Sequence, residues 1–123
     1  MTSSEFDVLM EEALKIIPLR FRRKLKNVVF LVEREPPSPN LLGLYQGRPL
    51  THRSVSDSFT MPDRITIFQG PHERLARNPL QLRKLVEETV WHEVAHYFGM
   101  DEDRVRRAER RRRARMKSIS VSK

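Results

Sequence analysis

The chain has 123 residues, of which 38% are hydrophobic and 33% are charged, and its formal net charge is +8. This length allows one domain with a single modest core. The sequence has no cysteine, which excludes disulfides and thiolate metal sites, and no apolar run approaches the roughly 20 residues that a membrane-spanning helix requires.

The positive charge is concentrated near the C-terminus. Residues 1–103 hold 14 basic and 15 acidic side chains, whereas the segment from Arg104 to Lys117 holds nine basic side chains against Glu109 alone. Such a segment either docks to nucleic acid or an acidic protein partner, or is a solvated, disordered tail. Because the N-terminus lacks the basic start of a signal peptide, we expect a cytoplasmic protein without membrane contact.

The first predicted element is a helix that ends at Pro18. Ser4 and Asp7 resemble a capping pair at its start. A short basic turn or helix over residues 19–25 follows it. Apolar residues recur along the first helix at the spacing that gives one buried side: Phe6, Leu9, Met10, Ala13, Ile16 and Ile17.

Three β-favouring stretches come next. Residues 28–32 form a continuous apolar run that is typical of a buried strand, residues 41–47 form a second strand that ends in a glycine turn, and residues 64–69 alternate as a third. His52, in the polar stretch between the last two, is interpreted as an exposed loop histidine. His72, at a turn or short helix after the third strand, is expected on the surface.

The longest predicted helix covers residues 78–99. Asn78 provides an N-cap, Pro79 suits the first helical position, and Gly99 suits a left-handed turn at the end. Its apolar side is formed by residues at helical spacing: Leu82, Leu85, Val86, Thr89, Val90 and Val94.

This helix carries the chemistry that we expect of the chain. His92 and His96 are four residues apart, so they lie about 40° apart on the helix at roughly 100° per residue, and both imidazoles can reach one ion. Glu93 projects beside them as a base for a metal-activated water. A lone helical histidine is usually structural and a lone glutamate usually forms a salt bridge, but the H-E-x-x-H arrangement predicts a metal site.

A catalytic zinc ion usually has three protein ligands. If Gly99 turns the chain back toward the metal, Glu102 is the first candidate for the third ligand, with Asp103 or Asp101 as alternatives. The extended motif reads like that of metzincins with a carboxylate in place of their third histidine, although no methionine after His96 suits a Met-turn.

The segment His92-Glu93-Val94-Ala95-His96-Tyr97-Phe98-Gly99, together with Gly43-Leu44-Tyr45-Gln46-Gly47 and Pro62-Asp63-Arg64-Ile65-Thr66-Ile67-Phe68, resembles short bacterial zincin-like metallopeptidases with a minimal zincin fold. The resemblance implies an α+β domain, with a small mixed sheet packed against the active-site helix and with N- and C-terminal helices. We expect this single domain to cover residues 1–117, including a basic C-terminal helix, with a disordered tail at 118–123.

The resemblance also implies the site. His92 and His96 would bind one Zn²⁺ per chain, Glu93 would be the general base, and the family commonly has aspartate at the position of Glu102. The strand at residues 64–69 would be the edge strand that pairs with an extended substrate. The leading hypothesis is therefore a zinc metallopeptidase that hydrolyses a peptide or protein substrate. The alternative is a non-catalytic metal-binding or regulatory module that docks through its Arg-rich C-terminus.

Overall fold

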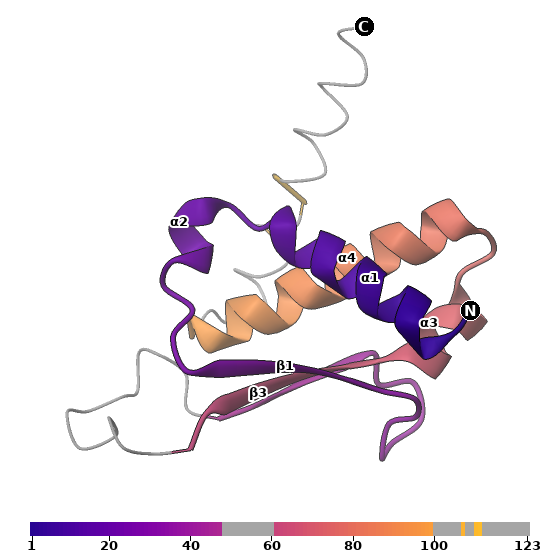
Figure 1. Ribbon diagram of the computed structural model, residues 1–123, viewed down its shortest axis with the longest axis horizontal. Coiled ribbons are helices and arrows are strands. Elements are labelled where there is room, and N and C mark those ends of the chain that lie inside the picture. Colours follow the sequence, from indigo (N-terminus) through magenta and orange to yellow (C-terminus); the bar gives the residue numbers. More distant parts are fainter. Residues whose placement is uncertain (48–60, 100–106, 108–109, 112–123) are drawn as a thin grey trace, which may run out of the picture.

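The computed structural model describes residues 1–47, 61–99, 107, 110 and 111. In this part of the chain a three-stranded sheet is covered on one face by helices, as Figure 1 shows for α1 (Ser3–Lys15) and α4 (Pro79–Tyr97). This arrangement confirms the predicted α+β class. The described helices include none long and apolar enough to cross a membrane.

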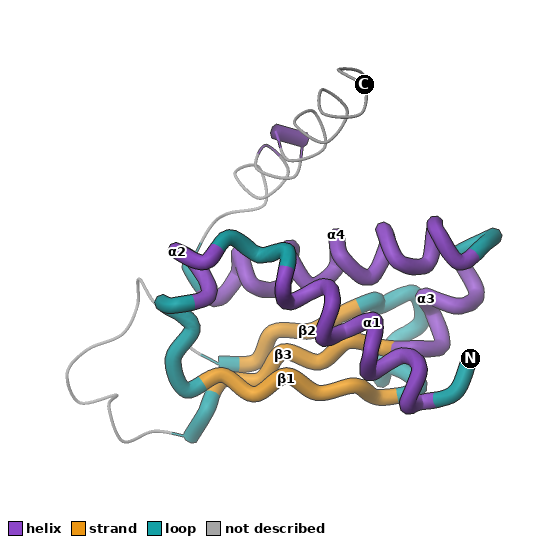
Figure 2. Tube along the Cα trace, turned by 45° about the horizontal axis from the view of Figure 1, so that its top comes forward, coloured by secondary structure: helices purple, strands orange, loops and turns teal. Residues whose placement is uncertain are grey.

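The sheet has the order β1-β3-β2, seen side by side in Figure 2. The central strand β3 (Asp63–Phe68) pairs in parallel with β1 (Val28–Glu33) and antiparallel with β2 (Gly43–Gln46). The third predicted strand is therefore central, and its expected role as an edge strand is wrong. The first predicted strand, expected to be buried, lies at an edge instead, and Val29 in it is 39% exposed.

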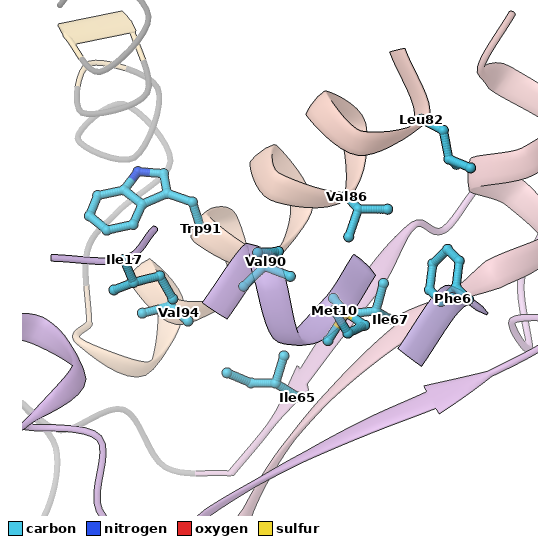
Figure 3. Close-up of a cluster of buried hydrophobic side chains, with 11 residues drawn as sticks. Phe6, Met10, Ile17, Ile65, Ile67, Leu82, Val86, Val90, Trp91 and Val94 are labelled. Atoms are coloured by element: carbon cyan, nitrogen blue, oxygen red, sulfur yellow. The ribbon is translucent and has the colours of Figure 1, made fainter. Parts of the chain in front are cut away.

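The core lies between the sheet and the two long helices. Ile65 and Ile67 of β3 point toward the helices, and Figure 3 shows them beside Met10 of α1 and Val90 of α4. These side chains are at most 4% exposed. The same cluster includes further buried residues from both helices and from the chain after α1: Phe6, Ala13, Ile17, Leu82, Val86, Trp91 and Val94.

The N-terminal helix begins earlier than the sequence predicted. The Thr2 hydroxyl accepts a hydrogen bond from the Glu5 backbone N–H at 3.1 Å, and the Thr2 backbone N–H donates to the Glu5 carboxylate at 3.2 Å. This capping box replaces the expected pair of Ser4 and Asp7. A capping box uses Glu or Gln at the third helical position, which Glu5 supplies here. Asp7 has a shorter side chain than Glu or Gln.

Two short helices connect the longer elements. The first, α2 (Leu19–Arg22), confirms the predicted basic turn, and the second, α3 (Gln69–Leu75), starts directly where β3 ends. The Asn78 side chain then caps α4 by accepting a hydrogen bond from the Gln81 backbone N–H at 2.9 Å. Gly99 has a φ of 76°, the left-handed conformation predicted at the end of this helix.

The two sides of α4 have different neighbours. Val90 and Val94 face the core. His92 is two residues from each of them, and at about 100° per residue this places it on nearly the opposite side of the helix. His96, one turn later, follows His92 on the same side. The core contacts of the valines therefore fix the direction in which both histidines point.

Candidate metal centre

His92 and His96 face each other across one turn of α4. Their Nε2 atoms are 3.1 Å apart, and their ring centroids are 4.7 Å apart. Two imidazole nitrogens bound to one tetrahedral zinc ion at about 2.05 Å would be about 3.3 Å apart. The observed separation therefore fits a shared zinc ion.

Glu93 completes the cluster. One potential ligand atom from each of His92, Glu93 and His96 lies within 4.8 Å of the other two. Glu93 is only 7% exposed, whereas both histidines are partly exposed. The cluster thus combines two accessible nitrogen donors with a carboxylate that is largely shielded from bulk water.

Strand β2 packs closely against the motif at Gly43. A Cβ atom placed on Gly43 would lie 2.8 Å from Thr89 Cγ2 and 3.0 Å from Glu93 Cγ. Both separations are shorter than ordinary van der Waals contacts between carbon atoms. A glycine is therefore needed here for spatial reasons, and its absent side chain lets the edge strand lie against the segment of α4 that carries Glu93.

A groove runs along α4 and borders the motif on its N-terminal side. It has a volume of about 310 Å³ and lies between the helix and the chain leading into β2. The helix contributes Leu85, Glu88, Thr89, His92 and Glu93, and the other wall consists of Asn40, Leu41, Leu42 and Gly43. The metal cluster is thus next to a depression of the size that begins to accommodate small ligands.

His72 is not on the surface as predicted, because its side chain is fully buried. Its Nδ1 lies 2.6 Å from the Phe68 carbonyl oxygen and its Nε2 lies 2.9 Å from the Thr89 hydroxyl oxygen. Burial lowers the pKa of His72, and the hydrogen bond to Phe68 opposes this shift only in part. The ring is therefore neutral, with Nδ1–H donating to Phe68 and with Nε2 free to accept from Thr89.

The Thr89 hydroxyl connects this buried histidine to the site. It lies 2.9 Å from His72 Nε2 and 2.9 Å from the Leu85 carbonyl oxygen, and its single proton is shared between these two acceptors. Its methyl group is the atom that limits the space at Gly43. The contact with His72 therefore orients a side chain that lines the groove beside Glu93.

The structure brings together three of the predicted site residues, His92, Glu93 and His96. The candidates for the third ligand, Asp101, Glu102 and Asp103, lie outside the described residues, as does His52. Local sequence patterns do not single out the supporting residues His72, Gly43 and Thr89. The sequence identifies Thr89 and Gly43 only as parts of a helix side and a strand, because their roles depend on contacts between distant segments.

Comparisons with known proteins agree with this arrangement. The family model described as zincin-like metallopeptidase matches residues 25–112. Among solved structures, a conserved hypothetical protein from Thermo thermophilus is similar with a TM-score of 0.56 and 26% sequence identity, over 80% of this chain and 94% of that one. None of the curated proteins matches. Since the family model spans the sheet, the H-E-x-x-H helix and the chain between them, the protein belongs to the family of zincin-like metallopeptidases.

Proposed function

We propose that the protein is a zinc-dependent peptidase that hydrolyses a peptide or amide bond. The observation that carries this proposal is the 3.1 Å separation of the His92 and His96 Nε2 atoms, with the Glu93 carboxylate in the same cluster. Two nitrogen donors leave the remaining positions of a tetrahedral ion for a carboxylate and for water or substrate. Membership of the zincin-like family supports the same chemistry.

Each residue of the motif has a role in this proposal. His92 and His96 hold zinc through Nε2, and the third ligand is Glu102, or Asp103 or Asp101 in its place. Zinc, when bound, supplies a Lewis acid for the scissile carbonyl and lowers the pKa of a water toward about 7. The Glu93 carboxylate accepts a proton from the attacking water and delivers it to the leaving amine.

The substrate backbone is proposed to pair with β2. In the described part of the chain, β2 pairs with β3 along one edge only, and Gly43 at its start lies against Glu93. An extended peptide added to the other edge would gain main-chain hydrogen bonds while passing the motif. This assignment replaces the strand at residues 64–69, which has a neighbour on both sides.

The Glu93→Gln variant tests the catalytic assignment. It keeps the size of the side chain and removes the base, so hydrolysis of a peptide library should fall by about 100-fold or more while zinc remains bound. Glu12→Gln is the matched control, because Glu12 is an exposed carboxylate on α1 and should leave hydrolysis unchanged. Full activity of Glu93→Gln would show that another group acts as the base.

A further inference from the structure

The groove beside the motif has an apolar part and an acidic part. Leu41, Leu42 and Leu85 supply the apolar surface, and the partly buried Glu88 supplies a carboxylate. No lysine or arginine is among the described residues that line the groove. The charged residues among those that line the groove are therefore Glu88 and Glu93, and both are acidic.

We propose that this groove is a subsite for a lysine or arginine side chain of the substrate, with Glu88 as the residue that determines this specificity. The proposal rests on the peptidase function proposed above and names the substrate class. Its basis is the presence of three leucine side chains and the Glu88 carboxylate in one groove, which matches a side chain with an aliphatic stem and a cationic end.

The position of Glu88 relative to the metal ligands fits this occupant. Glu88 precedes His92 by four residues, which corresponds to about 6 Å along the helix axis. A substrate residue next to the scissile bond therefore needs a long side chain to bring its end from the zinc ligands to Glu88. Lysine and arginine have this reach, whereas alanine and valine do not.

The two ends of such a side chain have different requirements. Its aliphatic stem gains from contact with Leu41, Leu42 and Leu85, which a chain of the same length without charge would also make. Its cationic end would gain a charge-assisted hydrogen bond from Glu88. An acidic side chain would instead meet the carboxylates of Glu88 and Glu93. Because Glu93 is assigned to the catalytic step, Glu88 is the residue expected to distinguish lysine from norleucine.

The test uses full-length, zinc-loaded protein and peptides that differ only at one position beside the cleaved bond. That position carries lysine, arginine, norleucine or glutamate, and is varied on each side of the bond in turn. Lysine and arginine peptides should be favoured over norleucine by about 10-fold, mainly through a lower KM. In Glu88→Gln this preference should disappear with kcat retained, and in Glu88→Lys glutamate should be favoured. Glu12→Gln is again the charge-matched control.

A second measurement does not depend on turnover. Binding of the same peptides to the Glu93→Gln variant, measured by calorimetry, should show the same order and lose it when Glu88→Gln is added. Circular dichroism and zinc content verify that the Glu88 variants remain folded and loaded.

The possible results separate the two proposals. Hydrolysis without a preference for lysine over norleucine would overturn the subsite and leave the peptidase function intact. Absence of hydrolysis would overturn the peptidase function, and binding would then decide the subsite alone, with equal binding of all peptides overturning it. Loss of zinc, or an equal fall in kcat for every peptide, in Glu88→Gln would mean that Glu88 supports His92 and does not contact the substrate.

Discussion

At the scale of single residues, the site depends on polar side chains that the fold buries to different degrees. His92 and His96 are partly exposed, whereas Glu93 and His72 are almost or fully buried. A buried polar group is tolerated only with partners, and His72 has two, the Phe68 carbonyl and the Thr89 hydroxyl. The buried His72 ring therefore helps to hold the Thr89 side chain in its position beside the groove.

The lowered pKa of His72 predicts a pH dependence of stability. The folded state keeps the ring neutral, while the unfolded chain takes up a proton near the ordinary value of 6.5. The contribution of His72 to the free energy of unfolding should thus be fully present above about pH 6.5 and should be lost as the pH drops through that value toward the folded pKa. This residue changes the free energy of unfolding by at most about 1.4 kcal/mol per pH unit. Denaturant unfolding of metal-free protein between pH 8 and pH 5 measures it.

The matched variant for this prediction is His72→Gln, which lacks the titrating ring. It should be less stable than the wild type by about 1–3 kcal/mol at pH 8, because it leaves buried hydrogen-bonding groups of Phe68 and Thr89 unsatisfied. The difference between the two proteins should shrink as the pH falls below about 6.5. A difference that stays constant with pH would mean that folding does not lower the pKa of His72.

At the scale of elements, the contact between β2 and α4 brings the edge of the sheet to the motif. The Gly43→Ala variant should force β2 away from Thr89 and Glu93, because the new Cβ would lie 2.8 and 3.0 Å from their side-chain atoms. We expect a loss of about 1–3 kcal/mol in the free energy of unfolding and a higher KM for peptides. Urea denaturation and peptide kinetics measure the two effects.

The control for Gly43→Ala is Gln46→Ala on the same strand. The Gln46 side chain is exposed, so this change should stay within about 0.5 kcal/mol. If Gly43→Ala is equally neutral in both measurements, β2 does not need to lie close to α4 for binding.

The start of α1 gives a second test at this scale. Thr2→Ala should lower the free energy of unfolding by about 0.5–2 kcal/mol, because it removes the side-chain cap of the Glu5 backbone N–H. Ser4→Ala should change it by less than about 0.5 kcal/mol, since Ser4 is exposed within the first turn. Thermal unfolding measures both variants. A larger loss of stability in Ser4→Ala than in Thr2→Ala would mean that Ser4 is the N-cap, as the sequence predicted.

At the scale of the whole molecule, the sequence predicted what depends on neighbouring residues. The paired histidines of α4, its Asn78 cap and its end at Gly99 follow from spacings of a few residues, and all were correct. The order of the strands and the burial of His72 depend on contacts between distant segments, which no local pattern encodes. The resemblance to zincin-like metallopeptidases implied an edge strand at residues 64–69, but β3 lies at the centre of the sheet.

The distribution of charge suggests a further property of the whole chain. We propose that the basic segment 104–117 docks to nucleic acid, because residues 1–103 are close to neutral and the described Arg107, Arg110 and Arg111 are exposed. Binding to an RNA or DNA oligonucleotide should weaken steeply with salt and should vanish in a chain that ends at residue 103. Replacing Arg110 and Arg111 by glutamine should lower the salt dependence.

The outcome of that experiment also bears on the alternative function. A truncated chain that loses oligonucleotide binding but still hydrolyses peptides would assign docking and catalysis to separate parts of the molecule. Oligonucleotide binding in a protein that neither holds zinc nor hydrolyses peptides would favour the non-catalytic docking module. Undiminished oligonucleotide binding by the truncated chain would contradict the proposed role of the basic segment 104–117.

The metal content of the purified protein shows whether His92 and His96 hold a zinc ion as proposed. The protein is purified without added metal and without a histidine tag, and its metals are measured by mass spectrometry. We expect about one zinc ion per chain, lost in His92→Ala and retained in Glu93→Gln. A wild-type protein that contains no metal and also fails to bind added zinc would contradict the proposed metal site and, with it, the peptidase function.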